Sequence, residues 1–159
     1  MTAQELENWI LNHYDGLIVT NAYRERSFFY NPDRSLPKGV YFATIKESDG
    51  PNDKSSNLDR DNVYRLSLGV GKKNYQELFG AIPKRPEKGE IVDLEMNFTE
   101  LQKLMPHPIY AWLNWIAILS PNIENVEMIK HLFDISYEKV THSFQKKQPL
   151  TFSQLAKKA

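Results

Sequence analysis

Residues 59–71 read Asp59-Arg60-Asp61-Asn62-Val63-Tyr64-Arg65-Leu66-Ser67-Leu68-Gly69-Val70-Gly71, the clearest strand signal in the chain. Within this stretch Tyr64, Leu66, Leu68 and Val70 alternate with Val63, Arg65, Ser67 and Gly69. Alternation with a period of two is typical of a strand that buries one face. We therefore expect the sheet to form around this strand, with Arg65 and Ser67 on the face opposite to the apolar side chains.

The chain before this strand predicts a helix followed by an antiparallel meander. Thr2 and Glu5 have the spacing of a capping box, so the helix is expected to begin there. Three runs rich in β-branched and aromatic residues then predict strands, at residues 17–20, 27–30 and 40–45. Residues 47–57 are almost entirely polar, which predicts a surface loop and the least ordered internal segment.

The chain after this strand predicts three helices and one more strand. A short helix is expected over residues 72–79, closed by a glycine, and another over residues 98–105, ended by the proline that follows. The apolar run 109–119 predicts a buried strand in its later part, although periodicity alone leaves a helix open. Ser120 then has the position of an N-cap before the longest helix, which runs to about residue 144.

This order of elements implies an α+β fold, in which a mostly antiparallel sheet of about five strands packs on the N-terminal and long C-terminal helices. A chain of 159 residues is the size of one ordinary domain. We expect that domain to span residues 1–145. Residues 146–159 form a basic C-terminal tail, either docked or mobile.

Composition excludes several classes of protein. Lys plus Arg number 20 and Asp plus Glu number 20, so the formal net charge is zero and no long-range attraction to nucleic acid is built into the chain. The absence of cysteine excludes disulfides, thiolate nucleophiles and cysteine-ligated metals. An acidic N-terminus and the lack of a long apolar run predict a soluble cytoplasmic protein without membrane contact.

No metal and no cofactor is expected. Glu127 and His131, like Glu138 and His142, lie four residues apart on the predicted last helix. The two histidines are eleven residues apart, about 16 Å along a helix, so they cannot share one ion, and solvated pairs are the better interpretation. The glycines of residues 69–72 lack the spacing of a phosphate-binding loop and are interpreted as a structural turn.

Three motifs carry a resemblance to a known family. They are Asp-Arg-x-x-Val-Tyr-Arg-Leu-x-x-Gly-Val-Gly at residues 59–71, Leu-Phe-Gly at 78–80 and Pro-His-Pro-Ile-Tyr at 106–110. With them the chain resembles small bacterial proteins catalogued as an uncharacterised domain of unknown function. More distantly it resembles the MmcQ/YjbR-like proteins, which place a Pro–Tyr segment before a Trp-bearing strand and end on a long helix. The resemblance implies a compact α+β fold with no established activity to transfer.

The candidate site lies around Arg65 and His107. Two prolines fix the backbone of His107, and an ordinary pKa near about 6.5 suits a general base or a ligand contact. The alternative is a rigid connector whose imidazole satisfies a backbone carbonyl. We hypothesise that Asp59, Arg65, His107 and Tyr110 share one cleft, with the arginine as clamp for an anionic ligand. A structural Asp–Arg ion pair that pins a loop is an equally good interpretation.

These residues leave several functions open. The preferred one is a module that binds a small molecule or a partner, and the expected contacts are Asp49, Arg60, Arg65, His107 and Tyr110. The alternative is a small hydrolase-like acid–base enzyme that uses His107 with an aspartate, for which Asp59 is the candidate. A weak DNA-binding protein is a third interpretation, since Lys84 and Arg85 belong to a scattered set of basic residues, but a neutral chain argues against it. The ligand and the oligomeric state are beyond the sequence.

Overall fold

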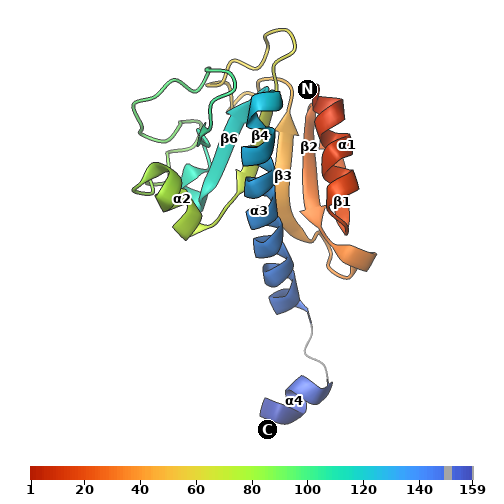
Figure 1. Ribbon diagram of the computed structural model, residues 1–159. Coiled ribbons are helices and arrows are strands. Elements are labelled where there is room, and N and C mark those ends of the chain that lie inside the picture. Colours follow the sequence, from red (N-terminus) through yellow and green to blue (C-terminus); the bar gives the residue numbers. More distant parts are fainter. Residues whose placement is uncertain (149–151, 159) are drawn as a thin grey trace.

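The computed structural model describes residues 1–148 and 152–158, and its centre is a six-stranded antiparallel sheet (Figure 1). The strands are β1 (Leu17–Ala22), β2 (Glu25–Tyr30), β3 (Val40–Lys46), β4 (Arg65–Gly69), β5 (Met105–Pro106) and β6 (Trp115–Leu119). They are arranged in the order β1-β2-β3-β4-β6-β5, so the predicted strand β4 lies inside the sheet, between β3 and β6. The expected α+β fold with a mostly antiparallel sheet is confirmed.

Two of the four helices among the described residues, α1 (Ala3–His13) and α3 (Val126–Lys147), cover one face of this sheet (Figure 1). The others are α2 (Lys72–Phe79) and α4 (Phe152–Lys158), with short 3-10 turns η1 (Pro32–Arg34), η2 (Ala111–Leu113) and η3 (Ile123–Asn125). The predicted capping box of Thr2 and Glu5 begins α1. Figure 1 shows α3 crossing the sheet with α1 at its side, and the Tyr14 hydroxyl donates to the Asp134 carboxylate on α3 at 2.6 Å. We call this side of the sheet the helix face.

The apolar residues of β4 point to the helix face, as their alternation predicts. Leu66 pairs with Ile45 on β3 and with Ile118 on β6, and paired residues of neighbouring strands share a face. All three side chains are buried, and Phe42 lies against Phe133 of α3 with ring centroids 5.7 Å apart. Burial of these side chains against the helices provides the main hydrophobic stabilisation of the fold.

The opposite side of the sheet, which we call the second face, is buried around β4 as well. Arg65 is only 1% exposed and Ser67 is fully buried. The expectation that Arg65 points away from the apolar side chains is confirmed, but the arginine does not reach solvent. The loop after β3 covers it, and Ser56 of that loop is itself fully buried. Residues 47–57 therefore form a loop that is mostly at the surface, as expected, but Asp53 and Ser56 tie it to Arg65 in the sheet.

The helix predicted over residues 98–105 is wrong. The Asn97 side chain accepts from the Thr99 backbone N–H at 2.9 Å, so the cap-like pattern closes a single turn. The chain then runs along the sheet edge, where the Gln102 N–H donates to the Leu119 carbonyl at 2.7 Å and Gln102 has a positive φ of 63°. It enters β5, whose proline is compatible with an edge strand because no neighbour needs its missing N–H.

The beginning and end of the long helix also differ from expectation. Ser120 is not its N-cap: its hydroxyl accepts from the Tyr64 N–H and donates to the Asn62 carbonyl, both at 3.2 Å. Asn122 caps the short turn η3, and Asn125 is the N-cap residue of α3 itself, without a side-chain cap bond. At the other end α3 extends to Lys147, and residues 152–158 are helical as α4. The break predicted at residues 146–149 begins later than expected, because Lys146 and Lys147 are helical and Gln148 is the C-cap. Pro149, the last residue of that prediction, lies outside the described residues.

Among the described residues, no helix combines the length and the apolar character that crossing a bilayer requires.

Candidate functional site

A group of polar side chains lies together on the second face, and we call it the polar cluster: Lys46, Asp53, Arg65, Ser67 and His107. Strand pairing brings most of it together, because Lys46 on β3 pairs with Arg65 on β4, and Ser67 follows Arg65 by two residues on the same face. Asp53 comes from the loop after β3. His107 follows β5, and its backbone N–H donates to the carbonyl of Trp115 on β6 at 3.0 Å.

Arg65 is held by the loop that covers it. Its guanidinium forms a two-pronged pair with the Asp53 carboxylate, through Nη2 to Oδ2 and through Nη1 to Oδ1 at 2.9 Å. Nη1 also donates to the Ser56 hydroxyl at 3.2 Å. The Arg65 Nε–H is buried and has no hydrogen-bond partner in the described part of the chain. An Asp–Arg ion pair that pins a loop is therefore present, but its carboxylate belongs to Asp53 and not to Asp49 or Asp59, the aspartates considered from the sequence.

Ser67 carries the second free polar atom. Its Oγ is buried and makes no hydrogen bond to any described residue. A buried polar group without a partner costs about 1–3 kcal/mol. Arg65 and Ser67 occupy successive positions on the same face of β4, so two such groups fall in one small region. Two uncompensated polar atoms side by side in a well-packed sheet make this region the candidate site.

His107 is fixed in one tautomer. Its Nδ1 accepts from the backbone N–H groups of Ile109 and Tyr110, both at 3.0 Å. A neutral imidazole with an acceptor at Nδ1 carries its proton on Nε2, which makes that atom a donor. The ring therefore caps the backbone turn that leads into η2. The alternative considered from the sequence had the imidazole bound to a carbonyl, whereas it binds two N–H donors.

Electrostatics keep His107 neutral. Burial lowers its pKa well below the ordinary value of 6.5, and the positive charges of Arg65 and Lys46 lower the pKa further. Lys46 is buried apart from a tenth of its side chain, and its ammonium lies 3.9 Å from the Glu25 carboxylate.

Asp49, Asp59 and Arg60 serve the loop that covers the second face. Asp59 accepts from the Asp49 backbone N–H at 3.0 Å, and Asp49 accepts from the Leu58 N–H at 2.7 Å. Arg60 donates to the carbonyls of Ser56 and Thr99 at 3.1 and 2.9 Å. These three residues therefore form hydrogen bonds that brace the loop, whereas the strand register places both Arg65 and His107 on the second face.

Aromatic residues border the polar cluster, and sequence reasoning had singled out one of them, Tyr110. We call Tyr41, Tyr110 and Trp115 the aromatic rim. The Tyr41 and Trp115 rings meet edge to face at 5.2 Å, and the Tyr110 ring lies 5.1 Å from the His107 imidazole. A Cβ on Gly69 would meet the Trp115 indole at 3.1 Å, so this glycine makes room for the ring. Tyr41 is 40% exposed and Tyr110 47% exposed.

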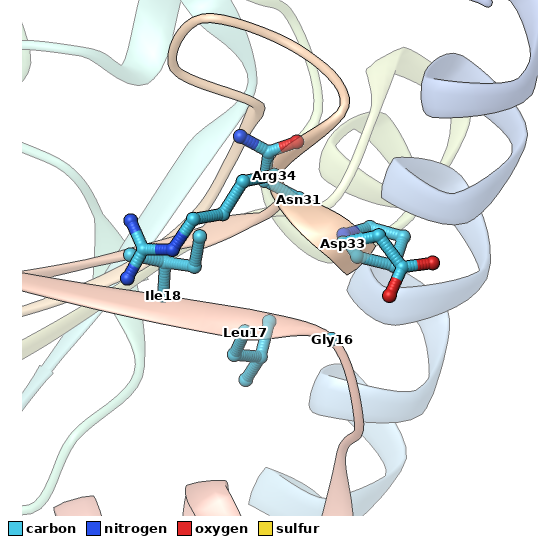
Figure 2. Close-up of a pocket in the computed structure, with 7 residues that line it drawn as sticks. Gly16, Leu17, Ile18, Asn31, Asp33 and Arg34 are labelled. Atoms are coloured by element: carbon cyan, nitrogen blue, oxygen red, sulfur yellow. The ribbon is translucent and has the colours of Figure 1, made fainter.

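A separate open pocket of about 360 Å³ lies at the start of β1 (Figure 2). It is lined by Gly16, Leu17, Ile18, Asn31, Pro32, Asp33 and Arg34. Figure 2 shows Arg34 extended beside Ile18, with the Asp33 carboxylate turned the other way. The Asn31 side chain is occupied at both ends by the backbone of Leu36, at 2.8 and 3.0 Å. The pocket has no buried polar atom without a partner among the described residues, which makes it a weaker candidate than the polar cluster.

No group of three or more His, Asp or Glu side chains among the described residues is placed to hold a metal ion. Comparison with known proteins gives a match over residues 1–149 to a family described as "Family of unknown function (DUF6194)". No curated protein and no solved structure matches the chain. The match includes all six strands and helices α1 to α3.

Proposed function

We propose a ligand-binding function for this chain, which belongs to the DUF6194 family of unknown function. The family description names no activity, so the proposal depends on the polar cluster. The observation that carries it is the pair of buried, unpartnered atoms Arg65 Nε and Ser67 Oγ on successive positions of the same strand face. A bound ligand that accepts hydrogen bonds from both would remove their desolvation cost.

The chemistry of the polar cluster favours an anionic ligand. Arg65 Nε–H, His107 Nε2–H and the Lys46 ammonium are all donors. Both carboxylate oxygens of Asp53 are already engaged by Arg65. Donors therefore outnumber free acceptors, and charge-assisted hydrogen bonds to an anion are roughly twice as strong as neutral ones.

Acid–base catalysis by His107 has less support. Two backbone N–H groups occupy Nδ1, where an orienting aspartate would otherwise bind, and Asp59 is bound to the Asp49 backbone. The lowered pKa of His107 also makes the imidazole a weaker base at neutral pH. Weak DNA binding has less support as well, because the chain has no net charge and the Arg85 guanidinium already lies 4.8 Å above the Trp112 ring. Both remain predictions.

Substitution of Ser67 tests the proposal. Acetate, benzoate, citrate, phosphate and sulfate would be titrated into 15N-labelled protein while amide shifts are followed by NMR. We expect at least one of these anions to shift the amides of Ser67 and Gly69, and Ser67→Ala to weaken its binding about tenfold or more. Ser136→Ala is the matched control, because this buried serine bonds the Phe42 carbonyl on the helix face.

Two results would contradict ligand binding at the polar cluster. If no anion binds, or if binding shifts only the residues of the pocket at Gly16–Arg34 and is unchanged by Ser67→Ala, the polar cluster is a structural network. The finer assignments made from sequence stay predictions: the distant MmcQ/YjbR-like relationship, a cytoplasmic location, and a single domain at residues 1–145 followed by a tail.

A further inference from the structure

We propose that the ligand is a planar aromatic carboxylate, whose carboxylate binds at the polar cluster while its ring lies against the aromatic rim. This inference depends on the proposed function, since it names the ligand of the same site. It is carried by the order of side chains on the second face, by the exposure of the rim and by the charges at its border.

Strand pairing arranges the second face in three rows. One row contains the charged pair Lys46 and Arg65, and the next contains Thr44 and Ser67. The third row contains aromatic residues, with Phe29 paired to Tyr41 on β2 and β3 and the Trp115 indole lying over Gly69 of β4. Charge, hydroxyl and aromatic ring therefore follow one another across the face, at a spacing of about 7 Å between residues i and i+2 of a strand.

The aromatic row continues toward the polar cluster from a second side. Tyr110 lies beside His107, which is within the influence of Arg65 and Lys46. The Tyr41 hydroxyl is 3.1 Å from the Ser27 hydroxyl, in the row of small polar residues. The Tyr41 ring meets the Trp115 ring edge to face at 5.2 Å, and Trp115 is bonded through its carbonyl to the backbone N–H of His107, beside Tyr110. The rings of Tyr41 and Tyr110 thus border the cluster.

Large aromatic side chains left half in water at a buried polar cluster are well suited to hold a flat ring. Tyr41 and Tyr110 are 40% and 47% exposed, whereas Phe29 of the same row is 5% exposed. Aromatic pairs contribute about 0.5–1.5 kcal/mol beyond the area that they bury, when the rings are offset or edge to face. A saturated ring of the same size lacks this term.

Charge complementarity selects the acid. Lys38 lies with its ammonium 5.2 Å from the Phe29 ring, so a second lysine borders the aromatic row. Lys46 has only a distant partner, the Glu25 carboxylate at 3.9 Å. A carboxylate in front of Ser67 can accept from serine, arginine and histidine, whereas a cation there would find no free carboxylate oxygen on Asp53, since Arg65 binds both.

Three probes of nearly equal size separate the contributions. Benzoate has both the ring and the charge, cyclohexanecarboxylate has the charge without the aromatic ring, and benzamide has the ring without the charge. We expect NMR titration to give the tightest binding for benzoate, with cyclohexanecarboxylate about fivefold weaker and benzamide at least tenfold weaker. The shifts should include the amides of Ser67, Gly69 and Tyr110.

Variants then locate the ring. Tyr41→Leu should weaken benzoate about fivefold and leave cyclohexanecarboxylate within twofold of wild type. The control is Tyr23→Leu at the turn between β1 and β2, where the side chain is 94% exposed. That variant should leave both probes unchanged.

The outcomes distinguish the two proposals. Equal binding of benzoate and cyclohexanecarboxylate at Ser67 overturns the aromatic preference and leaves anion binding intact. Binding of phosphate or sulfate at Ser67, with no binding of benzoate, also overturns the inference alone. Retention of a single-stranded oligonucleotide on the rim with steep salt dependence, but no binding of the small acids, overturns it in favour of nucleic acid. Absence of any binding at Ser67 removes the proposed function as well.

Discussion

Arg65 and Asp53 form an ion pair that ties the loop between β3 and β4 to the middle of the sheet. The side chain of Arg65 is 1% exposed and the side chain of Asp53 is 17% exposed. The pair is therefore screened by protein on almost all sides, and neither charge can be removed alone without leaving the other uncompensated.

Breaking this pair should be severely destabilising. Asp53→Ala leaves a buried guanidinium without its counter-charge, and we expect the free energy of unfolding to fall by about 3–5 kcal/mol. Urea denaturation followed by circular dichroism measures it. Glu100→Gln, which breaks the exposed Lys103–Glu100 pair, serves as control and should cost less than about 1 kcal/mol. A loss in Asp53→Ala no larger than in the control would contradict the assigned role.

Two serines of the site should respond in opposite directions. Ser67→Ala removes a buried hydroxyl that has no partner among the described residues, so unliganded protein should be unchanged or more stable by up to about 1 kcal/mol. Ser56→Ala removes an acceptor of the Arg65 guanidinium and should cost about 1.5–3 kcal/mol. The measurement is chemical denaturation in a buffer free of organic acids. Equal losses in both variants would show that Ser67 is bonded in solution.

The neutral, buried His107 should make the fold sensitive to acid. Its pKa is lowered in the folded state, so below the unfolded pKa of about 6.5 the unfolded chain binds a proton that the folded chain does not. Above about pH 6.5 His107 therefore does not reduce the free energy of unfolding. As the pH falls below that value, the free energy of unfolding decreases by about 1.4 kcal/mol per pH unit until the pKa of the folded state is reached.

His107→Asn isolates this contribution. The Asn Oδ1 can accept from the Ile109 and Tyr110 N–H groups in place of Nδ1, so the turn is retained while the titration is removed. Denaturation at several pH values between 7 and 5 should show the stability of wild type falling toward that of the variant. Parallel curves for the two proteins would mean that the imidazole titrates normally.

Gly69 should resist any side chain. Ala at this position places its Cβ against the Trp115 indole, and we expect a loss of about 1–3 kcal/mol with a change in Trp fluorescence. Gly50→Ala is a suitable control, because its nearest neighbour is the flexible end of Lys46 at 3.6 Å. Unchanged stability and fluorescence in Gly69→Ala would show that the indole is free to move away.

The fold was more accessible from sequence than the site. Alternation over residues 63–70 predicted a strand with two distinct faces, and the apolar spacing predicted a long last helix, because both patterns are local. The burial of Arg65 was not predictable, since it depends on where a polar loop closes. The helix prediction for residues 98–105 is wrong for a similar reason. The Gln102 N–H donates to the carbonyl of Leu119, which is far away in sequence, and this pairing outweighs the local helix signal.

The aromatic rim shows the same limit. Tyr41 reaches the second face beside an irregularity in the pairing of β2 and β3 between Phe28 and Phe29. A register change of this kind reverses which side chains share a face, and no pattern in residues 40–46 reports it. His107, by contrast, was recognisable because two flanking prolines set it on a rigid segment, although the partners of its ring were not.

The long connection between β3 and β4 has a kinetic consequence. Antiparallel neighbours need only about two to five residues to join them, yet residues 47–64 intervene here and supply both the counter-charge and the cover of Arg65. Local opening of this connection would expose the polar cluster without separating any pair of strands. For the proposed ligand, fluctuations of the connection would then govern the rate of entry to Ser67, whereas contacts within the cluster would govern its residence time.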